Sequence, residues 1–142
     1  MLRHDLLFET DRFNLTEVGP HFINDICFGE DLAAWLRARL AERGVAAGDP
    51  GQEDWGWYLE ADYRGRHFLI GVGGNADETA AAERRNWGEW RVIIDPQRTM
   101  RERLRGLLGG AKPNDEATGE ELQALIRGIL EAQPDFRNVH AE

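Results

Sequence analysis

The dipeptide Arg64-Gly65 constrains the fold of this chain more than any other feature, because it separates two segments in which apolar and polar residues alternate. Residues 55–63 and 66–73 therefore predict a β-hairpin with a two-residue turn. Such a turn fixes the register, so that Asp62 faces His67 across the two strands. A shift of one residue would place polar side chains on the apolar face, and the predicted register is therefore internally consistent.

This register sorts the hairpin into two chemically different faces. One face is apolar and holds Trp57, Leu59, Ala61, Phe68, Ile70 and Val72. The other face holds Tyr58, Glu60, Asp62, His67 and Leu69. We expect the first face to pack in the core and the second to be available to solvent or to a partner.

Two helices are predicted from apolar residues that recur at spacings of three and four. Glu30–Arg43 has acidic residues in its first turn and Gly44 directly after its last turn. Thr118–Ala132 starts with Thr118 and Glu121, which fit a capping box.

The remaining elements are predicted from shorter patterns. Trp90 to Asp95 reads as a third strand that Pro96 ends, and residues 6–16 read as a strand or a short hairpin. Residues 77–85 are expected to form a short helix and residues 98–108 a further helical segment, followed by a linker over 112–117.

These elements predict an α+β fold, with an antiparallel sheet of three to five strands, two main helices packed on one of its faces and one short helix. The 142 residues are expected to form a single domain, since this length is common for one domain and sufficient for one core. The tail over residues 134–142 is expected to be frayed.

The formal net charge of −9 narrows the classes of partner. It argues against binding to nucleic acid and to anionic membrane surfaces, and it favours a basic protein partner. Cys27 is the only cysteine, and the first eight residues lack the apolar segment of a signal peptide, so we expect a cytoplasmic protein without disulfides. The histidines and acidic residues have no metal-ligand spacing, so neither a metal nor another cofactor is expected.

Residues 71–76, Gly-Val-Gly-Gly-Asn-Ala, fit the glycine fingerprint of dinucleotide-binding proteins, and Asp95 lies roughly where a ribose-binding acid belongs. The same glycines also suit a strand end that lies close to another backbone or forms a bulge. Because residues 66–73 already belong to a tight hairpin, the structural interpretation is favoured over nucleotide binding.

Two groups of side chains are candidates for binding. Asp62 and His67 are predicted cross-strand neighbours with Glu60 on the same face, an arrangement that suits acid–base chemistry or an exposed charge pair. The second group is aromatic, flanked by charged residues, and suits a ligand pocket or a protein contact. Together the candidate site residues are Trp55, Tyr58, Glu60, Asp62, His67, Trp87 and Trp90.

We expect a protein-binding module rather than an enzyme, because no catalytic set of residues is present in the sequence. An immunity protein that neutralises a basic nuclease toxin is one concrete version, by analogy, and self-association is another. The first alternative is a small-molecule-binding domain or enzyme that uses Trp55, Trp87 and Trp90 with Asp62 and His67. The second alternative is nucleotide binding through Gly71 to Ala76.

Overall fold

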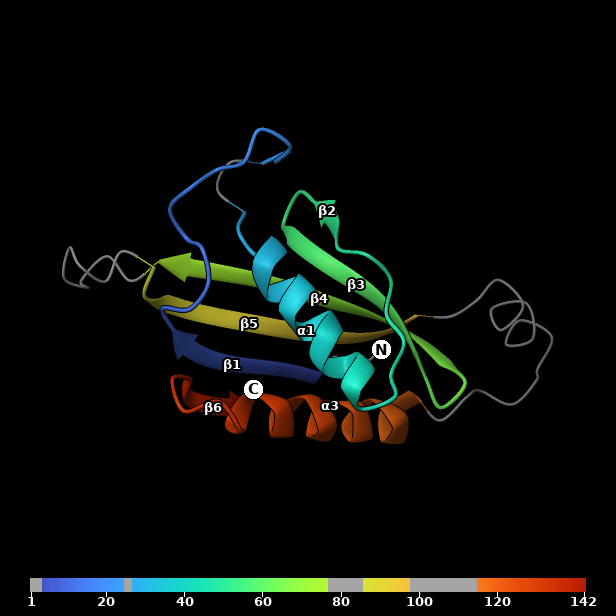
Figure 1. The fold of residues 1–142 in the computed structure, drawn as a ribbon. Helices are drawn as coiled ribbons and strands as arrows, with labels where there is room; N and C mark the ends of the chain where they lie inside the picture. The colour runs from blue at the N-terminus through green and yellow to red at the C-terminus, as the bar shows by residue number, and fades with distance from the viewer. Residues whose placement is uncertain (1–3, 25–26, 77–85, 98–114) are drawn as a thin grey trace.

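The computed structural model describes residues 4–24, 27–76, 86–97 and 115–142. In this part of the chain, six strands and two helices form an α+β structure (Figure 1). The elements are β1 His4–Thr10, α1 Glu30–Glu42, β2 Gly51–Glu53, β3 Gly56–Tyr63, β4 Arg66–Ala76, β5 Gly88–Gln97, α3 Asp115–Glu131 and β6 Arg137–Ala141.

The strands form a single sheet in the order β2-β3-β4-β5-β1-β6, and every neighbouring pair is antiparallel. The expectation of three to five strands is therefore too low. The two strands that the sequence did not reveal lie at the edges: β2 has only three residues, and β6 has no alternating apolar pattern. Strands this short or this polar give little periodic signal.

The hairpin β3–β4 has the predicted register, with Asp62 opposite His67 and Leu59 opposite Ile70. Arg64 and Gly65 have φ angles of 50° and 76°, so both turn residues adopt the left-handed conformation that suits the right-handed twist of the strands. All six residues of the predicted apolar face are buried.

Strand β5 extends the hairpin into a longer sheet, because it pairs with β4 on one side and with β1 on the other. Pro96 does not end this strand, which continues to Gln97. In the pairing of β1 with β5, the first described pair is His4 with Ile94. No described residue of β1 therefore lies opposite Pro96.

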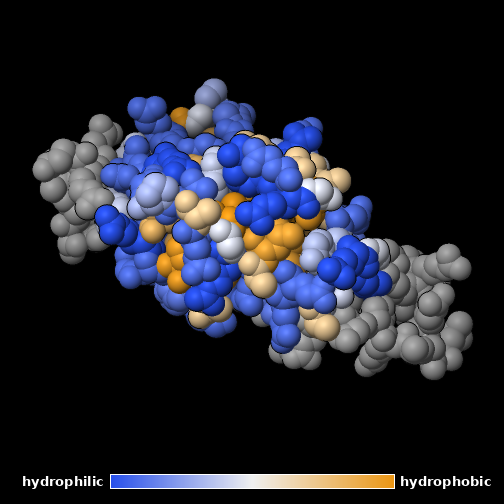
Figure 2. Space-filling model, turned by 60° about the horizontal axis from the view of Figure 1, so that its bottom comes forward, coloured by the Kyte–Doolittle hydropathy of each residue, from blue (hydrophilic) through white to orange (hydrophobic). Residues whose placement is uncertain are grey.

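The core is one cluster of buried hydrophobic side chains that includes residues from the sheet and from both helices. Helix α1 crosses in front of the sheet, and α3 runs beside β1 and β6 (Figure 1). Helix α1 contributes Leu32, Leu36 and Leu40, and α3 contributes Leu122 and Ile126. The side of the molecule toward α3 is largely hydrophilic around an apolar centre (Figure 2).

The ends of the helices differ in how well the sequence predicted them. Helix α1 starts at Glu30, and Gly44 follows it with a φ of 78°, as a C-terminal glycine should. Helix α3 starts earlier than predicted, at Asp115, so Thr118 lies inside the helix and is not its N-cap. The capping-box pattern at Thr118 lies inside a longer helical segment, so it predicted a helix start too late in the chain.

The C-terminal tail is not frayed along its length, because residues 137–141 form β6 and pair with β1. Phe136, just before this strand, stacks on Phe8 of β1 with ring centroids 4.8 Å apart. The backbone N–H of Glu142 donates to the carbonyl of Asp5. The predicted helical segments over 77–85 and 98–108 lie outside the described residues, as do residues 112–114 of the predicted linker, whereas its residues 115–117 belong to α3.

Candidate functional site

One face of the sheet carries side chains that are mostly half-buried or exposed, and we call it the open face. On β5 it presents Arg91, Ile93 and Asp95, which alternate with the buried Trp90, Val92 and Ile94. The open-face side chains of β3 and β4 are those predicted for the polar face of the hairpin. The Glu60 and Asp62 side chains are 61% and 77% exposed, so this part of the face is accessible to solvent.

Trp55 lies on the open face, although it precedes β3 and belongs to the turn after β2. Its indole ring lies against Gly71: a Cβ atom on Gly71 would come within 2.7 Å of Trp55 Cη2. The carbonyl oxygen of Trp55 is the nearest neighbour of a Cβ placed on Gly73, at 3.8 Å. Gly71 therefore leaves the space that the Trp55 ring uses, and Trp55 remains 47% exposed.

A hollow with a volume of about 440 Å³ lies beside this ring, and we call it the Trp55 hollow. Its lining combines apolar side chains with charged and amide groups from β4 and β5. The lining residues are Trp55, Leu69, Gly73, Asn75, Arg91, Ile93 and Asp95.

The cation in this hollow, Arg91, is held by two carboxylates from neighbouring parts of the sheet. Its Nη1 donates to Asp5 Oδ2 and its Nη2 to Glu142 Oε2, each at 2.6 Å. The hydrogen bond to Asp5 is the main reason that the pKa of Arg91 is raised. The group formed by these three side chains carries a net negative charge, so Arg91 does not make the hollow a receptor for anions.

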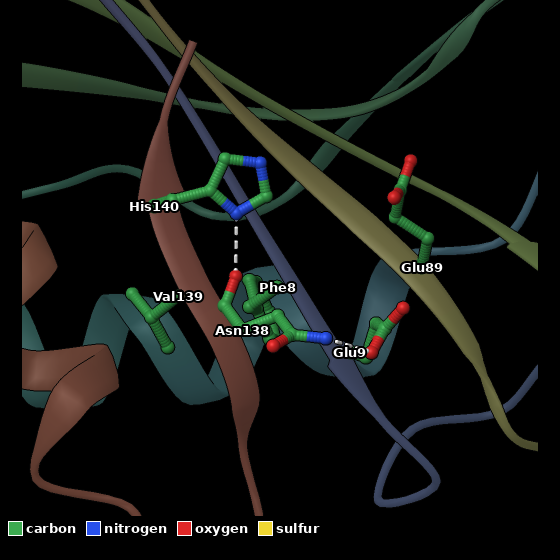
Figure 3. A pocket seen from close by; sticks show the side chains of 6 residues that line it. All are labelled: Phe8, Glu9, Glu89, Asn138, Val139 and His140. Atoms are coloured by element: carbon green, nitrogen blue, oxygen red, sulfur yellow. Dashed lines mark hydrogen bonds between the residues drawn. The ribbon is translucent and has the colours of Figure 1, made fainter.

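A second hollow, of about 400 Å³, lies over β5, β1 and β6. Figure 3 shows the side chains that line it: Phe8, Glu9, Glu89, Asn138, Val139 and His140. His140 Nδ1 lies 2.6 Å from the carbonyl oxygen of Asn138, and Asn138 Nδ2 donates to Glu9 Oε2 at 2.7 Å.

Glu9 and Glu89 are directly opposite each other in the pairing of β1 with β5. Like charges at this position repel each other and destabilise the sheet. Within residues 4–24, 27–76, 86–97 and 115–142, neither carboxylate forms an ion pair.

The predicted neighbours Asp62 and His67 are in contact, and Glu60 joins them. His67 Nδ1 lies 2.9 Å from Asp62 Oδ1, and His67 Nε2 lies 3.4 Å from Glu60 Oε1. The hydrogen bond with Asp62 is the largest cause of a raised pKa at His67, and partial burial opposes it. Together the three side chains form an exposed charge cluster at the hairpin end of the open face.

The predicted aromatic group does not form one cluster. Trp90 is fully buried in the core, on the side of β5 opposite to the open face, because it shares its orientation with Val92 and Ile94. Trp87 is half-buried and directly precedes β5. Tyr58 lies on the open face, with its ring against Gly51 of the adjacent strand. Trp55 and Tyr58 are the aromatic candidates whose contacts place them on this face.

Several residues of the two hollows were not predicted as site residues: Arg91, Ile93, Glu9, Glu89, Asn138 and His140. Alternation along residues 90–95 indicates that Arg91 and Ile93 lie on the side of the strand opposite to Val92 and Ile94. To predict that Glu9, Asn138 and His140 lie together, one must know that β1 pairs with β6. No local sequence pattern indicates this pairing.

The glycine fingerprint does not form the strand–turn–helix that dinucleotide binding requires. Gly71 to Ala76 all lie within β4, and the pairing with β5 continues as far as Ala76 opposite Gly88. Gly74 lies against Trp90, where an added Cβ would come within 2.6 Å of the ring. Glycine at positions 71 and 74 is thus explained by the rings of Trp55 and Trp90, which pack against Gly71 and Gly74.

Cys27 is half-buried, and its thiol donates to the carbonyl of Asp54 at 3.1 Å. Burial, and to a lesser extent the Asp54 charge, raise the pKa of this thiol, so it is not an activated nucleophile. Among the residues that the structure describes, no group of three or more His, Cys, Asp and Glu side chains could hold a metal ion. None of the described helical segments is both long and apolar enough to span a membrane.

No protein-family model, curated protein or solved structure matches this chain.

Proposed function

We propose that this chain is a protein-binding module that uses the open face of its sheet to bind a basic protein. The observation that carries the proposal is the composition of this face. It presents an exposed tryptophan beside a hollow, and several carboxylates lie on the same face. Exposed tryptophan is enriched at the centres of protein interfaces. Carboxylates at the rim attract a basic partner and increase its association rate.

The carboxylates extend across most of the face, which favours a partner surface over a single charged group. Glu60 and Asp62 lie at the hairpin end, and Glu9 and Glu89 lie at the second hollow. Asp95 lies between them on β5. A basic nuclease toxin, as in the immunity-protein hypothesis, is one partner of this kind.

The experiment compares two double variants with the same change of charge. Glu60→Lys with Glu89→Lys reverses two charges on the open face. Glu42→Lys with Glu131→Lys reverses two exposed charges on the helices α1 and α3. Each variant and the wild type are immobilised, and extract from the source cells is passed over them. The bound proteins are identified and quantified by mass spectrometry.

A basic protein that the wild type and the helix variant retain, and that the open-face variant loses, would support the proposal. Equal retention by all three proteins would overturn it. The melting temperatures of the variants show whether loss of binding reflects loss of folding.

A small-molecule-binding domain is the second candidate, because the volume of the Trp55 hollow lies within the range of ligand pockets. In this version Trp55 and Asp95 would contact the ligand, whereas Trp90 would not, since it is buried. Native mass spectrometry of the protein from its own source tests this directly. A bound mass of a few hundred daltons would favour it over the protein-binding module.

A further inference from the structure

We infer that the Trp55 hollow receives a cationic side chain, arginine or lysine, of the basic partner. This inference rests on the proposed function and specifies its chemistry. Three observations carry it: an exposed tryptophan that lines a hollow, two carboxylates that directly precede this tryptophan in sequence, and an arginine of the same hollow that is paired with two carboxylates.

The indole is positioned to bind a cation because its ring is fixed and accessible at the same time. Gly71 leaves space for the ring to lie on the sheet, and the ring is still 47% exposed. A cation above an indole face is attracted by the negative charge of the π system. Because the ring already packs on the backbone, little conformational freedom is lost when a ligand stacks on it.

Two acidic residues directly precede Trp55 in sequence: Glu53 ends β2, Asp54 lies in the same turn as Trp55, and both are exposed. Neither forms an ion pair within the described ranges. Their position directly before Trp55 places two negative charges near the indole, although neither side chain lines the hollow. A cation that stacks on Trp55 would therefore be stabilised by the ring and by these charges.

Apolar contacts in the hollow favour a cation on an alkyl chain over a simple metal ion. Leu69 and Ile93 are half-buried and line the hollow together with Trp55. Arginine and lysine have aliphatic stems that pack on apolar surface while the charged end stays in contact with polar groups. The opposing wall does not repel them strongly, because Arg91 is paired with Asp5 and Glu142.

The probes are two hexapeptides of the same length and shape, hexa-arginine and hexa-citrulline, the second of which lacks the charges. Arginine amide alone is the third probe. Binding is measured by calorimetry and by two-dimensional NMR of the ¹⁵N-labelled protein. The indole N–H signal of Trp55 is assigned from its absence in Trp55→Leu. This variant keeps an apolar side chain on Gly71 but has no π system.

We expect hexa-arginine to bind and to shift the Trp55 indole signal, and hexa-citrulline to do neither. Trp55→Leu should weaken the binding of hexa-arginine by roughly 3- to 30-fold, the range of a cation–π contact. Glu53→Gln with Asp54→Asn should weaken it more than the matched control Glu42→Gln with Glu131→Gln, which removes the same number of charges from the helices. Equal effects of the two double variants, or unchanged binding by Trp55→Leu, would overturn the inference.

Two results separate this inference from the proposed function. In the first, the open-face charge variant loses partner capture, but hexa-arginine does not bind at Trp55. This result would support the protein-binding module and refute the hollow as its cation site. Arginine amide that binds as tightly as hexa-arginine would instead identify a free organic cation as the ligand, and would overturn the assignment to a partner's side chain.

Discussion

The indole ring of Trp55 rests on the backbone of Gly71, so closely that a Cβ atom on Gly71 would lie 2.7 Å from Trp55 Cη2. Trp55 lies in the turn between β2 and β3 and Gly71 lies within β4, so the contact places this turn over the open face of the sheet. It joins two features that looked independent in the sequence: the glycine run and the exposed tryptophan. The glycines of β4 make room for tryptophan rings.

This contact predicts different effects for two neighbouring glycine substitutions. Gly71→Ala should lower the free energy of unfolding by about 1–2 kcal/mol, because the Trp55 ring must leave its position. Gly73→Ala is the control, since its nearest neighbour would be at an ordinary distance of 3.8 Å. Urea unfolding of both variants measures the difference. In a Trp55→Ala background Gly71→Ala should cost much less, and an unchanged cost there would contradict the explanation.

The sequence predicted the central part of the sheet well because local patterns determine it. Alternation over residues 55–73 and a two-residue turn specified the register of β3 and β4 completely. The strand at Trp90 followed from the same kind of pattern. The edge strands β2 and β6 depend instead on pairing between distant segments, and their residues carry no alternation that marks them.

The candidate site was predicted only where it belongs to the hairpin. The contact between Asp62 and His67 followed from the register, whereas Trp90, which was grouped with Trp55, faces the core. The orientation of Trp90 was predictable, since it lies two residues from Val92 on the apolar side of the strand. The position of Trp55 on Gly71 was not predictable from the sequence, because a turn residue has no fixed orientation relative to the sheet.

A second prediction concerns the two carboxylates that hold Arg91. The Asp5 side chain is 9% exposed and that of Glu142 is 55% exposed, although both lie 2.6 Å from the guanidinium. Asp5→Asn should therefore reduce stability by about 1.5–3 kcal/mol, as expected for a hydrogen bond between charged groups with little access to water. Glu142→Gln should cost about 0–1 kcal/mol, the usual contribution of an exposed ion pair.

Urea denaturation at low and high salt distinguishes the two. The small effect of Glu142→Gln should diminish further in 1 M salt, where exposed pairs are screened, and that of Asp5→Asn should persist. Equal costs for the two substitutions would show that burial does not control the strength of these contacts.

A third prediction concerns the reactivity of Cys27. Because burial and the Asp54 charge raise the pKa of the thiol above its ordinary value of 9.0, little thiolate is present at neutral pH. Alkylation of the folded protein by iodoacetamide at pH 7.4 should be slower than alkylation of the chain unfolded in urea. Asp54→Asn should increase the folded-state rate only modestly, since burial is the larger cause. A folded-state rate equal to that of the unfolded chain would contradict the raised pKa.

The last prediction is that the charge cluster of His67 makes stability depend on pH. The folded-state pKa of His67 lies above its ordinary value of 6.5, chiefly because of the hydrogen bond with Asp62. A group with a raised folded-state pKa stabilises the fold fully at pH values below its unfolded-state pKa, and this contribution disappears as the pH rises through the folded-state value. His67→Gln should therefore lower the melting temperature at pH 5.5 and have little effect at pH 9.

The two carboxylates beside His67 should contribute unequally to this dependence. Asp62 lies 2.9 Å from the ring and Glu60 lies 3.4 Å from it, so Asp62→Asn should remove most of the difference between pH 5.5 and pH 9, and Glu60→Gln less. An NMR titration of the His67 ring checks the cause directly, because its pKa should fall toward 6.5 in Asp62→Asn. A His67 pKa that does not move in this variant would show that another group holds the proton on the ring.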